Sequence, residues 1–217
     1  MQISEIFYSV QGEGKNVGVP TIFIRTATCN LSCDFCDSSY ASREQGKSLT
    51  QEAVLGHLSD YSCKNVCLTG GEPVFQQDFG ALVKNLLVLG YNIEVETNGT
   101  LRPPMFCLFS SKIQWNVSPK LSNSGNALDC SIQKDLLTVY NLTNHIFKFV
   151  IGNHSDFVEA SDLIRELGLI NVYMMPQGIT DKDLKETSLW LVEQCKKYDY
   201  NFSPRLHVWL WEGKGGV

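Results

Sequence analysis

Residues 20–37 read PTIFIRTATCNLSCDFCD, an apolar strand pattern that leads directly into three closely spaced cysteines. The apolar run predicts a strand over Pro20–Ala27. Cys29, Cys33 and Cys36 follow, with three residues between the first two cysteines and two between the second pair. A 4Fe–4S cluster normally takes one cysteine for each of its four irons, so three thiolates leave one iron with open positions. We interpret the cysteines as ligands of a catalytic cluster, because catalytic metal sites keep an open position.

A structural zinc site is the alternative for the same cysteines, but it needs four ligands. The fourth would come from another of the eight cysteines or from one of four histidines. Cys63 and Cys67 also lie close together, but no third cysteine follows them and Cys67 falls in an apolar strand pattern. We read both as core or surface residues, because free cysteine is commonly buried.

Length and composition limit the classes of protein. The 217 residues, of which 43% are hydrophobic and 19% charged, suit one globular domain over 1–217. A net charge of −5 without a basic run indicates no nucleic-acid partner. We find no apolar leader and no apolar stretch near the roughly 18 residues of a membrane span, so we expect a cytoplasmic protein with no membrane partner. Clustered cysteines in such a chain indicate metal rather than disulfides.

Strand patterns alternate with helical patterns along most of the chain. Strands are expected over Pro20–Ala27, Asn65–Thr69, Asn92–Glu96, Lys112–Val117, His145–Ile151 and Asn171–Met175. Helices are expected over about Thr50–Leu58, Asp78–Leu89, Ile132–Asn141, Ser155–Leu167 and Asp181–Tyr198, and a final extended segment over Pro204–Trp211. The alternation predicts parallel strands with right-handed crossovers. Six units are too few for a closed eight-stranded barrel, so we predict an α/β fold, a partial (open) TIM-like barrel of about six parallel βα units.

Short polar motifs stand where the predicted strands end. TGGEP covers residues 69–73, ETNG covers 96–99 and SPK covers 118–120, and the cysteine run follows the first predicted strand in the same way. Ligand sites in parallel α/β folds lie at the carboxyl ends of the strands. We therefore expect these motifs to surround one site.

At these residues the chain resembles the radical S-adenosylmethionine (SAM) superfamily, through CNLSCDFC after the first strand and GGEP after the second. The resemblance implies that the three cysteines hold a 4Fe–4S cluster and that SAM chelates the fourth iron. It also implies a 5′-deoxyadenosyl radical that abstracts a hydrogen atom from the substrate, while the protein orients the reactants and shields them from water.

The segment EIFYSVQGEGKNVGVPTIFIRTATCNLSCDFCDSSYA, together with TGGEP, ETNGT, SPK and the ending SPRLHVWLWEGKGGV, is similar to the 7-carboxy-7-deazaguanine synthase family over nearly the whole chain. The resemblance implies a lyase that converts 6-carboxy-5,6,7,8-tetrahydropterin to 7-carboxy-7-deazaguanine with loss of ammonia, in queuosine and other 7-deazapurine biosynthesis. It further implies regeneration of SAM, a requirement for Mg²⁺, a homodimer, and an electron donor such as flavodoxin or ferredoxin.

Within this resemblance, the substrate-binding segment matches Val10, Gln11, Gly12 and Glu13. Gln and Glu side chains suit the donors and acceptors of a pterin edge, although a glycine turn before a strand would also explain QGEG. Arg25 interrupts an apolar strand, so its charge needs a partner. That partner is either a substrate carboxylate, bound by both ends of the guanidinium, or an internal glutamate.

The same resemblance supplies the remaining site residues. The expected SAM contacts are Phe35, Cys36, Asp37, Gly70, Gly71, Glu72, Glu96, Thr97, Ser118, Pro119, Lys120 and Gln177. The further substrate contacts are Thr69, Arg205, His207 and the terminal carboxylate of Val217. Ser38 falls where the family often has Thr as a magnesium ligand, and it keeps the hydroxyl; a plain loop serine is the alternative. A structural role for His207 and a disordered glycine-rich tail also stay open.

Two other functions share part of the pattern. A small radical SAM activase, which generates a glycyl radical on a partner protein, shares the three cysteines and GGE but does not predict Gln11–Glu13. A non-catalytic zinc-binding interaction module would contain zinc without iron or sulfide.

Overall fold

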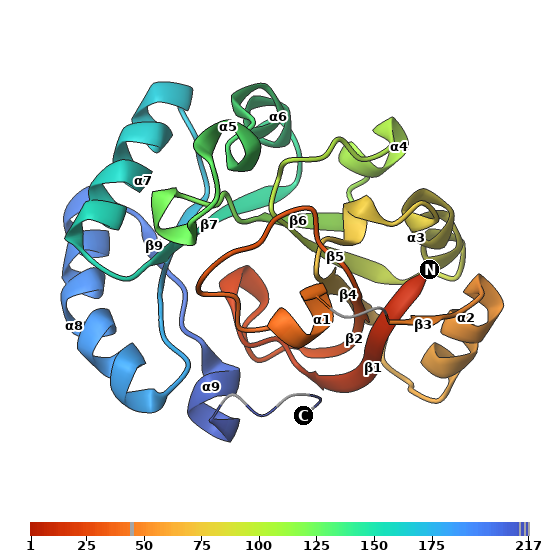
Figure 1. Ribbon diagram of the computed structural model, residues 1–217. Helices are drawn as coiled ribbons and strands as arrows, with labels where there is room; N and C mark the ends of the chain where they lie inside the picture. Colours follow the sequence, from red (N-terminus) through yellow and green to blue (C-terminus); the bar gives the residue numbers. More distant parts are fainter. Residues whose placement is uncertain (44–45, 213, 215, 217) are drawn as a thin grey trace.

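The computed structural model describes residues 1–43, 46–212, 214 and 216. Within them the strands form one curved sheet in the order β3-β1-β2-β4-β5-β6-β7-β8-β9, with most of the helices on its outer side (Figure 1). The strands are β1 Gln2–Val10, β2 Pro20–Thr26, β3 Lys47–Ser48, β4 Asn65–Gly70, β5 Asn92–Thr97, β6 Ile113–Val117, β7 His145–Ile151, β8 Val172–Pro176 and β9 Asn201–Phe202.

The helices connect successive strands, except α9, which follows β9. They are α1 Ser39–Arg43, α2 Gln51–Ser59, α3 Phe79–Val88, α4 Met105–Leu108, α5 Leu128–Ser131, α6 Lys134–Tyr140, α7 His154–Leu167, α8 Asp181–Tyr198 and α9 Leu206–Trp211. Short 3-10 turns cover Gly14–Asn16, Pro73–Phe75 and Ser122–Ser124. None of these helices combines the length and the apolar character that a membrane crossing needs.

Neighbouring strands from β2 to β9 are all parallel, whereas β1 runs antiparallel to both β2 and β3. The predicted α/β class with an open, partial barrel is therefore confirmed, as are the six predicted strands. β1 was not predicted: its pairing with β2 shifts register between Ile3 and Glu5, and such an irregularity breaks the two-residue period on which strand prediction depends. β3 and β9 have two residues each, too few to give a pattern.

The two faces of the sheet differ in chemistry because successive side chains of a strand point to opposite sides. Ile24 and Val95 are fully buried and belong to the core that the sheet shares with the helices. Their chain neighbours Arg25 and Glu96 point to the inner side instead, as does Lys148 of β7, and these polar residues line a cavity. The apolar half of the strand pattern thus builds the core, and the polar half builds the site.

The C-terminal segment departs from its prediction. Pro204–Trp211 was expected to be extended, but residues 206–211 form helix α9. The sheet pairing ends where Ser203 N donates to Met174 O, and Pro204 has no N–H with which to continue a ladder. Leu206 N then donates to Gly12 O, which turns the chain across the QGEG segment.

Candidate active site

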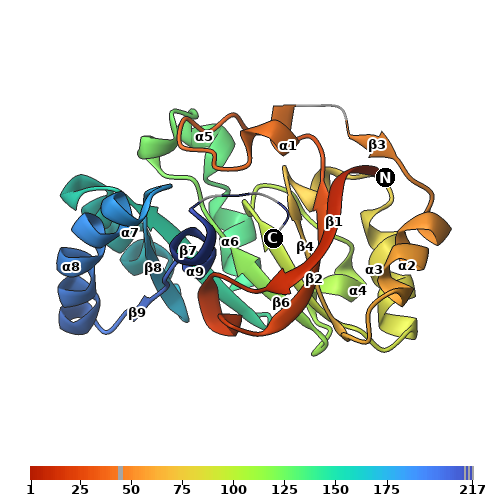
Figure 2. The same ribbon diagram turned by 90° about the horizontal axis from the view of Figure 1, so that it is seen from below.

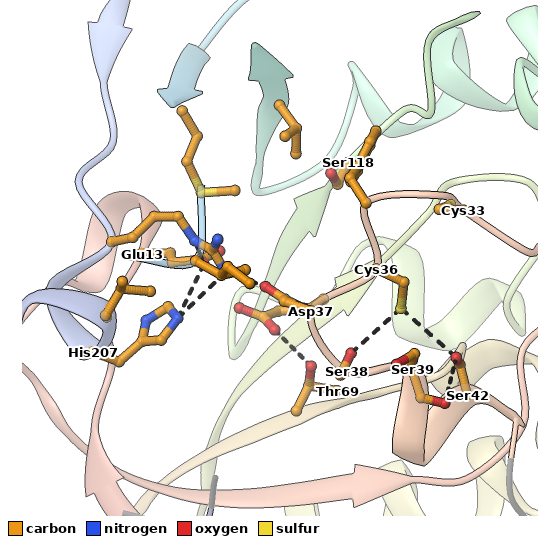
Figure 3. A pocket seen from close by; sticks show the side chains of 18 of the residues that line it. Glu13, Cys33, Cys36, Asp37, Ser38, Ser39, Ser42, Thr69, Ser118 and His207 are labelled. Carbon is orange, nitrogen blue, oxygen red and sulfur yellow. Dashed lines mark hydrogen bonds and ion pairs between the residues drawn. The ribbon is translucent and has the colours of Figure 1, made fainter. Parts of the chain in front are cut away.

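A cavity of about 1010 Å³ opens at the carboxyl ends of the parallel strands (Figure 3). Its wall combines the strand ends with the cysteine loop, QGEG and helix α9. Among the predicted site residues in the described part of the chain, only Glu72 and Pro119 do not line it. Val217, predicted as a substrate contact, lies outside the described residues. Glu212, Lys214 and Gly216 do line the cavity, so the described part of the tail follows its wall.

The three cysteines of the loop are free, half-buried and part of the cavity wall. Leu31 N donates to Cys29 Sγ at 3.4 Å, and Asn126 Nδ2 donates to Cys33 Sγ at 3.3 Å. Cys36 Sγ lies between two serine hydroxyls, Ser38 Oγ at 3.9 Å and Ser42 Oγ at 3.7 Å (Figure 3). Burial raises the pKa of the Cys29 and Cys33 thiols, and the Lys120 ammonium opposes this rise.

The spacing of these sulfur atoms distinguishes a cluster from a single ion. At a Zn–S distance of about 2.3 Å, thiolates on one zinc lie at most about 4.6 Å apart. The sulfurs of Cys29, Cys33 and Cys36 do not all lie within 4.8 Å of one another. Among the described residues, the cavity wall offers no fourth cysteine. The three sulfurs are therefore not gathered around a single ion, and three cysteines in one cavity wall are the ligand set expected of a 4Fe–4S cluster with one open iron.

The GG pair at the end of β4 allows the ends of β4 and β2 to approach each other closely. Gly70 has φ +124°, where only glycine is unstrained. A Cβ on Gly71 would overlap the Thr28 carbonyl at the start of the cysteine loop. In return, Glu72 N donates to Thr28 O at 2.9 Å. Glycine at both positions thus brings the backbone of β4 against the loop that carries the cysteines.

The Glu72 carboxylate lies inside the wall and not on the cavity surface. It is fully buried and accepts hydrogen bonds from Val74 N at 3.1 Å, Thr97 Oγ1 at 2.8 Å and Asn98 N at 2.7 Å. Burial raises the pKa of this carboxyl, and the three donors lower it. The structure therefore places Glu72 where it fixes the ends of β4 and β5, while Gly70 and Gly71 face the cavity.

Lys120 of SPK is a cation whose charge acts on Cys29 and Cys33. Its Nζ donates to Ser118 O at 2.8 Å and to Ser118 Oγ at 2.7 Å, and burial lowers its pKa. Ser118 and Lys120 line the cavity, as does Gln177 after β8. Phe35 and Asp37 reach the same cavity from the cysteine loop.

An ion network surrounds Glu13 on the opposite side of the cavity. Lys148 Nζ pairs with Glu13 Oε2, and Arg205 Nε donates to Glu13 Oε1 at 3.0 Å. Arg205 Nη2 also pairs with Asp37, and His207 Nε2 lies 3.7 Å from Glu13 Oε1. Although burial raises the pKa of Glu13, the charges of Lys148 and Arg205 hold it well below its usual range. Glu13 is therefore a stable anion in the wall.

Lys148 is the site residue that sequence reasoning missed. It is 5% exposed, lines the cavity, and its pKa is raised by Glu13 and Glu96 against the effect of burial. The signal was present, because Lys148 interrupts the apolar run HIFKFVI just as Arg25 interrupts PTIFIRTA. A lone charge in a buried strand needs a partner in both cases.

Gln11 lines the cavity in which the substrate contact was predicted, and the protein itself also binds both ends of its amide. It is 2% exposed, its Nε2 donates to Glu94, and its Oε1 accepts from Glu13 N at 3.2 Å. Asn16 and Asn116 donate to the same Glu94 carboxylate. Burial raises the pKa of Glu94 to about 7. Gln11 thus connects a buried carboxyl to the backbone that carries Glu13.

Arg25 pairs with an internal glutamate, Glu5, which is one of the two kinds of partner expected from the sequence. Its Nε donates to Glu5 Oε1 at 2.7 Å, and the Tyr40 hydroxyl donates to the same oxygen at 2.7 Å. This contact leaves the two Nη atoms of Arg25 outside the ion pair, and the residue lines the cavity. Thr69, next to Arg25 in the sheet register, donates its hydroxyl to Glu96 Oε2 at 2.6 Å.

Comparison with known proteins gives one consistent family. Residues 23–191 match the radical SAM superfamily. The chain is 33% identical to a 7-carboxy-7-deazaguanine synthase of Halobacterium salinarum, over 97% of this chain and 90% of the relative. It is 30% identical to a 7-carboxy-7-deazaguanine synthase of Clostridium acetobutylicum, over 100% of this chain and 99% of the relative.

Solved structures show the same fold. QueE from Escherichia coli superimposes with a TM-score of 0.73 at 23% identity, covering 95% of this chain and 94% of QueE. SuiB from Streptococcus suis superimposes with a TM-score of 0.63 at 18% identity, over 83% of this chain and 47% of SuiB. The protein is thus an enzyme with a 4Fe–4S cluster and SAM as its cofactors. The chain belongs to the 7-carboxy-7-deazaguanine synthase family of the radical SAM superfamily.

Proposed function

We propose that this protein converts 6-carboxy-5,6,7,8-tetrahydropterin to 7-carboxy-7-deazaguanine with loss of ammonia, in the biosynthesis of queuosine and other 7-deazapurines. The observation that carries the proposal is the composition of one cavity. The three cysteines lie in its wall together with Glu13, Arg25 and the other polar groups of the substrate side. The names of the relatives support the reaction.

Cys29, Cys33 and Cys36 would hold the cluster, and when bound, the cluster and SAM supply a radical that abstracts a hydrogen atom. The SAM contacts would come from the strand ends and the cysteine loop: Phe35, Cys36, Asp37, Gly70, Gly71, Glu96, Thr97, Ser118, Lys120 and Gln177, all of which line the cavity. Ser118 O and Oγ fix the Lys120 ammonium near the cysteines, where a carboxylate of the cofactor would find a cation. Glu72 and Pro119 would act from within the wall.

Arg25 would bind the carboxylate of the pterin. Glu5 and Tyr40 fix its Nε side, so the guanidinium plane is held while the Nη atoms stay outside that ion pair. Such a fork matches a carboxylate geometrically. Ser38, which lines the cavity close to Cys36, would supply a hydroxyl to Mg²⁺, an ion that takes few protein ligands.

Glu13 would accept hydrogen bonds from the N–H groups of the pterin edge. An ionised carboxylate is an acceptor only, and Lys148 and Arg205 keep this one ionised. Val10, Gly12 and Thr69 complete this side of the wall, and Gln11 would hold the segment in place. Arg205 and His207 join the C-terminal helix to Glu13, which would close the cavity against water.

The wider setting is proposed on the family resemblance. The protein would act as a single domain over residues 1–217 and as a homodimer in the cytoplasm. A flavodoxin or ferredoxin would supply the electron. These proposals are tested by the mass of the protein in solution and by the rate of cluster reduction with each donor.

An anaerobic assay tests the function. The reconstituted protein, with SAM, Mg²⁺ and a reductant, should form 7-carboxy-7-deazaguanine from the carboxytetrahydropterin, and omission of Mg²⁺ should lower the yield. Metal analysis should give iron and sulfide rather than zinc. An intact cluster with Mg²⁺ present and no product would refute the proposal.

A further inference from the structure

The polar stretch SNSGN, residues 122–126, has no part in the function proposed above, yet the structure fixes it beside the cysteine loop. Its backbone and that of the loop meet where Asp34 N donates to Ser124 O at 3.0 Å. Gly125 has φ +75°, and a Cβ there would overlap the Asp34 carboxylate. Figures 1 and 2 show the two segments side by side, with the cysteine loop in orange and the chain leading to α5 in green.

Asn126, the last residue of this stretch, contacts the loop through both ends of its amide. Its Oδ1 accepts from Ser32 N at 3.0 Å, and its Nδ2 donates to Cys33 Sγ at 3.3 Å. Nδ2 also lies 3.1 Å from Ser124 Oγ. The orientation of the amide follows from its partners, because a flipped amide would set its NH₂ group against the Ser32 N–H. The NH₂ group therefore faces the Cys33 sulfur, and Ser124 is its second acceptor.

The other two cysteines have weaker side-chain donors. Asn98 Nδ2 lies 3.9 Å from Cys29 Sγ and already donates to Asn30 Oδ1 at 2.9 Å. The hydroxyls beside Cys36 lie 3.7 and 3.9 Å away. Asn126 thus makes the shortest side-chain contact to a cysteine sulfur in the described loop. This asymmetry singles out one of the three cluster ligands.

We propose that Asn126 is a positioning residue that raises the reduction potential of the cluster through its hydrogen bond to Cys33. Reduction adds one electron to the cluster and no proton, and the added negative charge is shared with the cysteine sulfurs. A donor on a sulfur therefore stabilises the reduced state more than the oxidised state. The contact of Oδ1 with Ser32 N keeps the donor in place during the electron transfer.

A redox titration of the reconstituted holoenzyme, without pterin, tests this proposal. Asn126→Asp keeps an acceptor for Ser32 N, removes the donor to Cys33 and adds a negative charge, whereas Asn126→Ser removes the amide donor without a change in charge. Asn126→Asp should lower the equilibrium constant for one-electron reduction about tenfold, which is 59 mV for a one-electron couple. Asn126→Ser should fall between the wild type and Asn126→Asp. Iron content and the electron paramagnetic resonance signal of the reduced cluster should match the wild type.

Ser122→Ala is the matched control, because Ser122 lies in the same stretch and contacts Glu159 instead of a cysteine. Its potential should equal that of the wild type. An unchanged potential in Asn126→Ser would overturn the proposal, whatever the potential of Asn126→Asp, because the aspartate charge lowers the potential without any loss of a hydrogen bond. The proposal would also be overturned if neither Asn126 variant bound a cluster while Ser122→Ala did. Asn126 would then be needed for cluster assembly and would not set the reduction potential. The titration uses no pterin, so its outcome is independent of the proposed reaction.

Discussion

The two sides of the cavity are built in different ways. On the cysteine side, neutral donors contact the sulfurs, and apart from Asn126 and Asn98 they come from the loop itself or from α1. On the substrate side, Glu13 pairs with Lys148 and Arg205, which lie 135 and 192 residues away in the chain. Neutral donors suit sulfur that carries a cluster, and a dense ion network suits a polar pterin. The cysteine side is thus built mostly from residues that are close together in the sequence. The substrate side is built from residues that are far apart in the sequence and meet only in the folded protein.

The largest effect on cluster binding and activity is expected on the cysteine side. Cys33→Ala removes one of three cluster ligands and should abolish both the brown absorbance of the cluster and the activity. Cys63→Ala is the control, because Cys63 is half-buried like Cys33 but donates to the Pro20 carbonyl outside the cavity. Its iron content should be normal. Cluster absorbance in Cys33→Ala at the wild-type level would refute the ligand assignment.

The substrate side should depend on its ion pairs for stability. Lys148→Met leaves the Glu13 carboxylate buried with one cation fewer, and breaking a buried pair costs about 3–5 kcal/mol in the free energy of unfolding. Lys134→Met breaks a pair with Glu166 in which both side chains are more than half exposed, and it should cost under about 1 kcal/mol. Denaturant unfolding of the two variants measures both. Equal losses would show that the Glu13 network is no stronger than a surface pair.

The buried carboxyl beneath the substrate side should make stability depend on pH. Burial raises the pKa of Glu94 from 4.5 to about 7, so between these values the native state holds a proton that the unfolded state has lost. Stability from this group therefore falls as pH rises from about 4.5 to 7. Relative to Glu94→Gln, the free energy of unfolding of the wild type should fall by at most about 3 kcal/mol as pH rises through this window. A difference between the two proteins that stays constant from pH 4.5 to 8 would contradict this expectation.

The glycine contact between the end of β4 and the cysteine loop should give the smallest loss of stability. Gly71→Ala places a methyl group against the Thr28 carbonyl and should destabilise the protein by about 1–3 kcal/mol. Gly56→Ala in α2 meets nothing within 4 Å and should stabilise it by up to about 1 kcal/mol through helix propensity. Thermal unfolding distinguishes the two substitutions, because one should lower the melting temperature and the other should raise it. A neutral Gly71→Ala variant would mean that the strand ends have room to separate.

The sequence was informative where the signal is local. The cysteine spacing, GGEP and SPK each lie within a few residues, and the strands that precede them were predicted to within a residue or two. Lys148 also gave a local signal, a charge in an apolar strand, although it was not predicted. The pairing of Glu13 with Arg205 could not be predicted from the sequence. Helix α9 replaces the expected extended segment, and no local pattern indicates a contact across 192 residues. The internal binding of Gln11 depends likewise on Glu94, in a distant strand.

The contrast between the two sides is tested most directly by product formed per loaded cluster in Glu13→Gln. The substitution removes the charge at the centre of the substrate-side ion network and keeps all three cysteines, and Arg205 retains its other partner, Asp37 of the cysteine loop. We expect normal iron content and normal cluster reduction, with formation of 7-carboxy-7-deazaguanine reduced about tenfold to a hundredfold, the effect of losing a charged hydrogen-bond partner. Wild-type turnover per cluster, or loss of the cluster itself, would contradict a cavity whose two sides carry separate tasks.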